Sequence, residues 1–120
     1  MKIVKIGNKE FAMKSSAYTQ FAYKNETGRN LLTDIQSIIE LREKIEKEES
    51  INYFEILDNM TELLLKVAYV MALEADKNQI MDYTSFLKSI DNIYDDINWI
   101  TDVIELACTP ISGQLQRVAK

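Results

Sequence analysis

The sequence predicts a mainly helical fold, in which an N-terminal β-hairpin docks on a compact bundle of about four to five helices. Three observations carry this prediction. Apolar residues recur at spacings of three and four along most of the chain, which is typical of amphipathic helices. Only one proline and three glycines occur among 120 residues, so long helices can run without interruption. Residues 1–14 differ, because two β-prone runs flank a Gly-Asn pair there.

The length of the chain fits one domain, residues 1–120, with a hairpin (1–14), a helical body (15–108) and a tail (109–120) that we expect to fray. A chain of this size buries roughly two-thirds of its unfolded surface, so it needs neither a metal nor a disulfide to fold. Cys108 is the one cysteine, which excludes an intramolecular disulfide and fits a reducing compartment. Its apolar neighbours in sequence predict a buried side chain rather than a reactive thiol.

The hairpin is predicted from residues 2–6 (KIVKI) and 10–14 (EFAMK), which are separated by a turn at Gly7-Asn8. Glycine takes the positive φ that a tight hairpin turn requires. Alternation puts four apolar residues on matching faces of the two runs: Val4, Ile6, Phe11 and Met13. Because an isolated hairpin is marginal in water, we expect this face to dock on the helices.

Two helices are expected next. Ser15 or Ser16 can cap a first helix, which should end at Gly28 because glycine suits a left-handed C-terminal stop. Asn30 can cap a second helix over residues 31–49. Isoleucine and leucine form a broad stripe along this second helix, and its charged end alternates in sign at helical spacing.

A central helix is predicted over Tyr53–Ala75. Its first half has apolar residues on one face, whereas residues 63–73 are apolar nearly all round and only Lys66 interrupts them. A helix that is apolar on every side belongs in the middle of a core. The run is nevertheless far shorter than the ~20 residues that a bilayer requires.

The C-terminal part of the chain begins with a polar loop at about 76–83. From Phe86 to Ala107, apolar residues recur at alternating spacings of four and three. This pattern predicts either one helix or two helices with a kink near Asp91-Asn92, ended by Pro110. Its regularity suits a helix–helix contact either within one molecule or between molecules.

The composition excludes several kinds of chemistry. No histidine is present, which removes Ser-His-Asp and Cys-His catalysis as well as helix-borne zinc motifs. The glycines are single, so no phosphate-binding loop is predicted. Carboxylates remain, with Asp91 and Asp95 expected on one face of the last helix, and a weak calcium-like spacing at Asp76, Asn78 and Asp82. We interpret both groups as solvated surface and predict no catalytic residue, metal or cofactor.

Charge is unevenly distributed. Residues 1–30 carry six Lys/Arg against two Asp/Glu, whereas residues 31–120 carry eight against seventeen. An acidic body of this kind is a poor partner for a phosphate backbone, so we predict no nucleic-acid binding. The uneven charge is either simply solvated or favours head-to-tail contact between copies. The N-terminus lacks a signal-peptide pattern, and we therefore expect a cytosolic protein without membrane association.

The order of these elements resembles a known family. A lysine-rich hairpin, KIVKIGNKEFAMK, leads into a short helix with a glycine break, NETGRNLLTDI. The apolar run LLLKVAYVMALEAD is followed by DYTSFLKSID and an acidic closing helix. In these features, residues 1–107 resemble the tail assembly chaperones of long-tailed bacteriophages and prophages of Gram-positive bacteria. The tail after Pro110 has no counterpart in the family pattern.

The resemblance implies a non-enzymatic, mainly helical protein of the host bacterial cytoplasm. Such chaperones coat the long helical tape measure protein, keep it soluble and help to recruit the tail tube subunit. Some of them self-associate, so a homo-oligomer is a further expectation. A client of this kind would require apolar helical grooves, and five methionines and eleven aromatic residues are present to build them.

Three residues are our candidates for partner binding: Tyr94, Trp99 and Leu115. Tyr94 and Trp99 lie beside the apolar stripe of the last helical region, where an aromatic side chain serves either the core or a partner. Two other classes of function are alternatives. One is a small phage-encoded adaptor or inhibitor of a host protein, whose acidic body would mimic nucleic acid. The other is an enzyme, which would require a carboxylate pair in a cleft.

Overall fold

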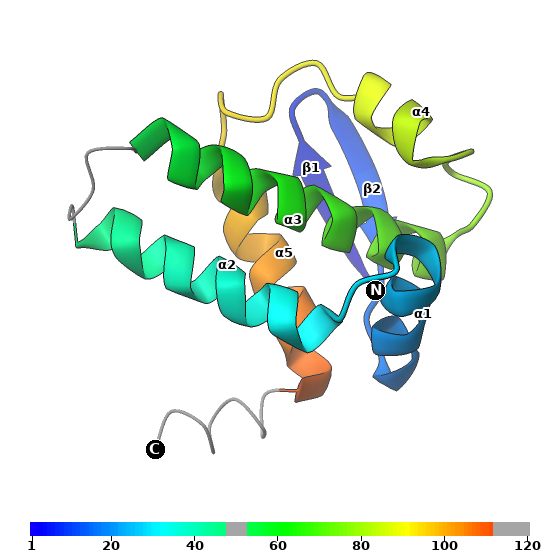
Figure 1. Cartoon of the computed structure of the whole chain (residues 1–120). Coiled ribbons are helices and arrows are strands. Elements are labelled where there is room, and N and C mark those ends of the chain that lie inside the picture. Colours follow the sequence, from blue (N-terminus) through cyan, green and yellow to red (C-terminus); the bar gives the residue numbers. More distant parts are fainter. Residues whose placement is uncertain (48–52, 112–120) are drawn as a thin grey trace.

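A computed structural model describes residues 1–47 and 53–111 of the chain. It confirms a mainly helical fold with an N-terminal β-hairpin (Figure 1). A short 3-10 turn, Thr109–Ile111, follows the last α-helix. In chain order the elements are β1 (Lys2–Ile6), β2 (Lys9–Met13), α1 (Ala17–Thr27), α2 (Leu31–Glu46), α3 (Tyr53–Ala75), α4 (Tyr83–Lys88) and α5 (Asn98–Cys108).

The hairpin docks on the helices through the predicted face. The strands are antiparallel with Val4 opposite Phe11, and four side chains of this face are almost fully buried: Val4, Ile6, Phe11 and Met13. Strand β2 packs on α3, whereas β1 packs on α5. Beyond its last residue, β2 is joined to α3 by a hydrogen bond from the Lys14 amide to the Met71 carbonyl at 3.1 Å. The amide side chain of Gln79 also bonds both backbone groups of Ala12, at 3.2 and 2.8 Å.

Helix α3 is the central element, as predicted. It contacts α1, α2, α4, α5 and β2 (Figure 1). Residues from Leu64 to Ala72 are buried with the single exception of Lys66, which explains why this run is apolar on almost every side. Within the described residues, no helix is both long and apolar enough to cross a membrane.

Helix α1 begins and ends at its predicted caps, and helix α2 begins at its predicted cap. Ser16 forms a capping box with Thr19, and Gly28 ends α1 with φ of 73°. Asn30 caps α2 by accepting a hydrogen bond from the Thr33 amide at 3.0 Å. Helix α2 ends at Glu46, and the last two positions of the predicted range 31–49 lie outside the described residues.

A buried polar cluster fastens α1 to α2. The Tyr23 hydroxyl donates to Asp34 Oδ2 at 2.6 Å, and the Arg29 guanidinium donates to both carboxylate oxygens at 2.7 and 2.9 Å. Burial by itself would raise the pKa of Asp34, but the hydrogen bonds from Arg29 and Tyr23 outweigh it and hold the pKa below its ordinary value. Burial and the adjacent carboxylate raise the pKa of Tyr23. The cluster therefore keeps a charged carboxylate inside the fold.

The C-terminal region differs from the prediction of one helix or two kinked helices. Residues 76–82 form the expected loop, but α4 is short and residues 89–97 are not helical. The Asn92 side chain accepts hydrogen bonds from the Tyr94 and Asp95 amides at 2.8 and 3.1 Å, and Asp96 accepts one from the Asn98 amide at 2.9 Å. Such local side-chain bonds compete with helical ones, which explains the interruption. We name residues 89–97 the connecting loop.

Candidate partner-binding groove

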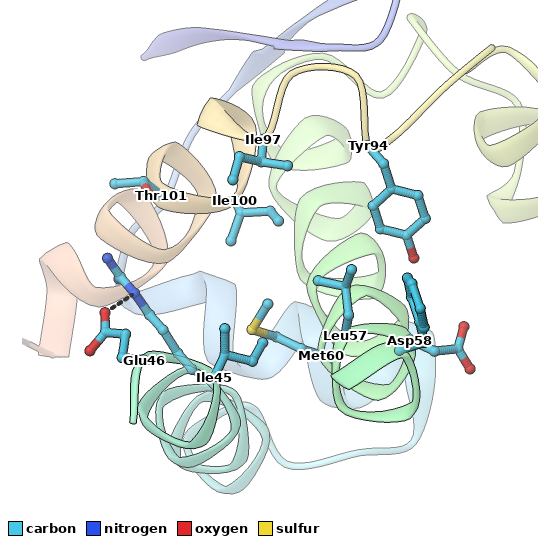
Figure 2. A pocket seen from close by; sticks show the side chains of 11 residues that line it. Ile45, Glu46, Leu57, Asp58, Met60, Tyr94, Ile97, Ile100 and Thr101 are labelled. Carbon is cyan, nitrogen blue, oxygen red and sulfur yellow. Dashed lines mark ion pairs between the residues drawn. The ribbon is translucent and has the colours of Figure 1, made fainter. Parts of the chain in front are cut away.

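A hollow of about 690 Å³ opens where the end of α2, the start of α3, the connecting loop and the start of α5 meet (Figure 2). We name it the apolar groove, because most of its lining side chains are hydrophobic: Ile45, Phe54, Leu57, Met60, Tyr94, Ile97 and Ile100. Its polar lining residues are Arg42, Glu46, Asp58 and Thr101. The groove thus brings together two stretches that are far apart in the sequence, residues 42–60 and residues 94–101.

The floor of the apolar groove is part of the protein core. Met60 and Ile100 are buried, and Leu57 and Ile45 are half-buried beside them. Figure 2 shows Ile45, Met60, Leu57, Ile100 and Ile97 arranged around one space. Because core packing fixes the floor, the groove is a preformed feature of the fold.

The walls of the groove are exposed. Phe54 retains 82% of its accessible surface, Ile97 59% and Tyr94 45%. Large apolar side chains that are singly exposed are normal on a protein surface, but a cluster beside an apolar hollow is typical of an interaction site. These three residues are therefore the exposed apolar surface that a partner would cover.

Charged groups lie at the rim. Arg42 Nε and Glu46 Oε1 form an exposed ion pair at 3.5 Å, within one face of α2. Figure 2 shows the Asp58 carboxylate directed away from the space between the apolar side chains. The inside of the groove is therefore suited to binding apolar groups.

The connecting loop that carries Tyr94 and Ile97 is held from both ends. On one side, the Asn8 amide donates to Asp91 Oδ1 at 2.9 Å, and the Asp91 amide donates to Asn8 Oδ1 at 3.3 Å. On the other side, the indole Nε1 of Trp99 donates to the Ile93 carbonyl at 2.8 Å. The hairpin turn and the core tryptophan thus position one wall of the groove.

The three predicted partner-binding residues have different locations. Tyr94 lines the groove, although it lies on the connecting loop and not on a helix as expected. Trp99 is only 1% exposed, so its role as a contact residue is corrected to that of a core side chain supporting the loop. Leu115 lies outside the described residues.

Phe54 and Ile97 line the groove, although the sequence did not single them out. In the sequence, Ile97 belongs to the continuous apolar stripe of the last helical region, which does not show whether its side chain is exposed. Phe54 lies three residues before Leu57 and extends the apolar stripe of α3 past the part that the core covers. When the apolar stripe of a helix is longer than the elements that pack on it, its uncovered end is exposed, and this excess length is the sequence signal for Phe54.

The acidic residues do not converge. Asp91 and Asp95 lie on the connecting loop, which corrects their expected placement on one helix face. Asp76 and Asp82 each accept a local backbone hydrogen bond, from Asn78 and Ser85 respectively. Among residues 1–47 and 53–111, no group of three or more His, Cys, Asp or Glu side chains could hold a metal ion.

Cys108 is half-buried at the end of α5. Burial raises the pKa of its thiol, which lowers the fraction of reactive thiolate.

Comparisons with protein-family models, curated proteins and solved structures found no match to this chain.

Proposed function

We propose that this protein is a non-enzymatic chaperone of phage tail assembly, which binds the tape measure protein through the apolar groove and keeps it soluble. The observation that carries the proposal is the clustering of Phe54, Tyr94 and Ile97 around an apolar hollow. The resemblance of the element order to tail assembly chaperones supplies the identity of the client. The tail tube protein is a second proposed partner, and the bacterial cytoplasm is the proposed location.

Groove chemistry supports the binding of a helical client. Helices with an apolar face commonly dock in hydrophobic grooves, which cover side chains at i, i+3, i+4 and i+7. Aromatic residues such as Phe54 and Tyr94 provide a large contact area with few rotatable bonds. Covering these side chains would shield a client stripe that otherwise promotes aggregation in water.

Co-expression with a phage tape measure protein tests the proposal. We expect the two proteins to co-purify, and we expect Ile97→Asp to abolish the complex by placing a charge against the client's apolar stripe. Phe21→Asp is the matched control, because Phe21 is 64% exposed on α1 and does not line the groove. Failure of the wild-type proteins to co-purify would contradict the proposed function.

An adaptor or inhibitor of a host protein is the second candidate. The observation that favours it is the absence of any Lys or Arg from residues 89–111, where Asp91, Asp95, Asp96 and Glu105 are exposed. Capture from a host lysate distinguishes the two functions. Recovery of one nucleic-acid-binding host enzyme, released by salt and unaffected by Ile97→Asp, would favour this candidate over the chaperone.

A further inference from the structure

Acidic residues predominate in the segments that form two sides of the apolar groove. The α3 wall, residues 53–65, contains Glu55, Asp58 and Glu62 but neither Lys nor Arg. The connecting loop and α5, residues 89–111, also lack Lys and Arg and contain Asp91, Asp95, Asp96, Asp102 and Glu105. Among the described lining residues, the single cation is Arg42 on α2, and Glu46 pairs with it.

Part of this negative charge is not neutralised within the described residues. Asp102 pairs with Lys2 at 3.2 Å, and Glu62 pairs with Lys66 at 3.8 Å. In contrast, six of these carboxylates are exposed and have no ion pair among residues 1–47 and 53–111: Glu55, Asp58, Asp91, Asp95, Asp96 and Glu105. Asp58 lines the groove, and Asp95 and Asp96 lie between Tyr94 and Ile97 in the sequence.

The walls of the groove also restrict the backbone of an occupant. Burying peptide N–H and C=O groups without hydrogen-bond partners is unfavourable in free energy. The lining is largely made of Ile, Leu, Met and aromatic side chains and lacks a strand, so an extended peptide would find few partners for its backbone. A helix satisfies its own backbone groups and presents only side chains.

We propose that the occupant of the apolar groove is an amphipathic helix whose apolar stripe is flanked by Lys or Arg. The stripe covers Phe54, Tyr94 and Ile97, while the flanking cations lie near Asp58, Asp95 and Asp96. This inference rests on the proposed function for the identity of the client and adds the charge that the client segment carries. Complementary charge at the rim favours one partner over another and speeds association.

Three dye-labelled peptides of equal length test the charge preference, in titrations with the full chain followed by fluorescence anisotropy. They share one leucine stripe and carry Lys, Gln or Glu at the flanking positions. We expect affinity in the order Lys, Gln, Glu, with a change of roughly twofold to fivefold for each rim charge. We expect the advantage of the Lys peptide to shrink as salt is raised, because the rim charges are exposed.

Two double variants locate the effect. Asp95→Asn with Asp96→Asn should remove most of the preference, and both substitutions preserve side-chain size and the ability to accept hydrogen bonds. The matched control is Glu10→Gln with Glu26→Gln, which removes two exposed charges from β2 and α1 and should leave the preference unchanged. Ile97→Asp should weaken the binding of all three peptides.

The outcomes separate this inference from the proposed function. Equal affinity for the Lys and Glu peptides, or no binding of any peptide, would overturn the inference while co-purification with the tape measure protein still supports the chaperone. If the protein self-associates at higher concentration and the peptides are displaced, the occupant of the groove is a second copy of the chain. That result would also overturn the inference.

Discussion

Asp34 is a buried acidic residue whose carboxylate is hydrogen-bonded to other side chains in place of water. Its carboxylate has lost nearly all contact with solvent, yet it is held by a bidentate guanidinium and a phenol. Removing a partner from a buried acceptor costs more than the bond itself contributes, because the acceptor is left without a replacement for water. The free energy of unfolding should therefore respond to small changes in this cluster.

Tyr23→Phe removes only the hydroxyl that donates to Asp34. We expect the free energy of unfolding to fall by about 1–3 kcal/mol, since one hydrogen bond to a charged buried group is lost. Urea denaturation monitored by circular dichroism measures this change. Tyr18→Phe is the matched control, because Tyr18 is exposed on α1 and should lose little stability. Equal effects of the two substitutions would show that the cluster adds no stability.

Asp34 should also make stability depend on pH. Its pKa is lower in the folded protein than the value of about 3.9 expected for the unfolded chain, so the folded state binds fewer protons. The stabilisation is present above about pH 4 and is lost as pH falls through the folded pKa. The difference in free energy of unfolding between the wild type and Asp34→Asn should therefore narrow from about pH 6 towards about pH 3. Parallel curves for the two proteins would contradict this assignment.

At the scale of elements, the β-hairpin supports the groove as well as the core. Gly7 has a φ of 62°, and a Cβ added there would collide with the Asn92 carbonyl oxygen and the Asp91 carboxylate. Both of these groups belong to the connecting loop, which carries Tyr94 and Ile97. The turn of the hairpin and one wall of the groove are therefore in direct contact.

Gly7→Ala should destabilise the protein and displace the connecting loop. Gly28→Ala is the matched control, because Gly28 has a similar φ of 73° but open space around its Cα. Both substitutions incur about 1–2 kcal/mol for a left-handed backbone. We expect Gly7→Ala to lose about 1–3 kcal/mol more through the steric conflict, and to weaken client binding as well. Thermal or chemical denaturation of both variants measures the difference, and identical losses would refute the close contact.

Elements with strong local signals were predictable from the sequence. Ser16, Gly28 and Asn30 mark the ends of α1 and α2 because capping depends on nearby residues. A kink near Asp91-Asn92 was one of the two predicted alternatives, but the extent of the connecting loop was not predictable. The apolar spacing continues through Ile90, Ile93 and Ile97 as if the helix were uninterrupted. Hydrogen bonds from Asn92 and Asp96 and contact with the distant hairpin turn override that pattern.

For the whole molecule, the fold class followed from periodicity, but the groove did not. Tyr94 was predicted as a partner-binding residue, and it does line the groove. The remaining lining depends on how far α2, α3 and α5 extend past one another, which is a tertiary property that no local pattern encodes. Trp99 illustrates the same limit, because an aromatic residue beside an apolar stripe faces the core or a partner according to the neighbours that cover it.

We propose that the molecule acts by covering the apolar helical surface of a client with the apolar groove. The most direct measurement is the dissociation constant of the tape measure protein for the wild type, Ile97→Asp and the control Phe21→Asp. We expect Ile97→Asp to raise the dissociation constant by about thirtyfold or more, as for a residue at the centre of an interface, and Phe21→Asp to change it by less than about threefold. Equal affinities of the wild type and Ile97→Asp for the tape measure protein would show that the apolar groove does not bind the client.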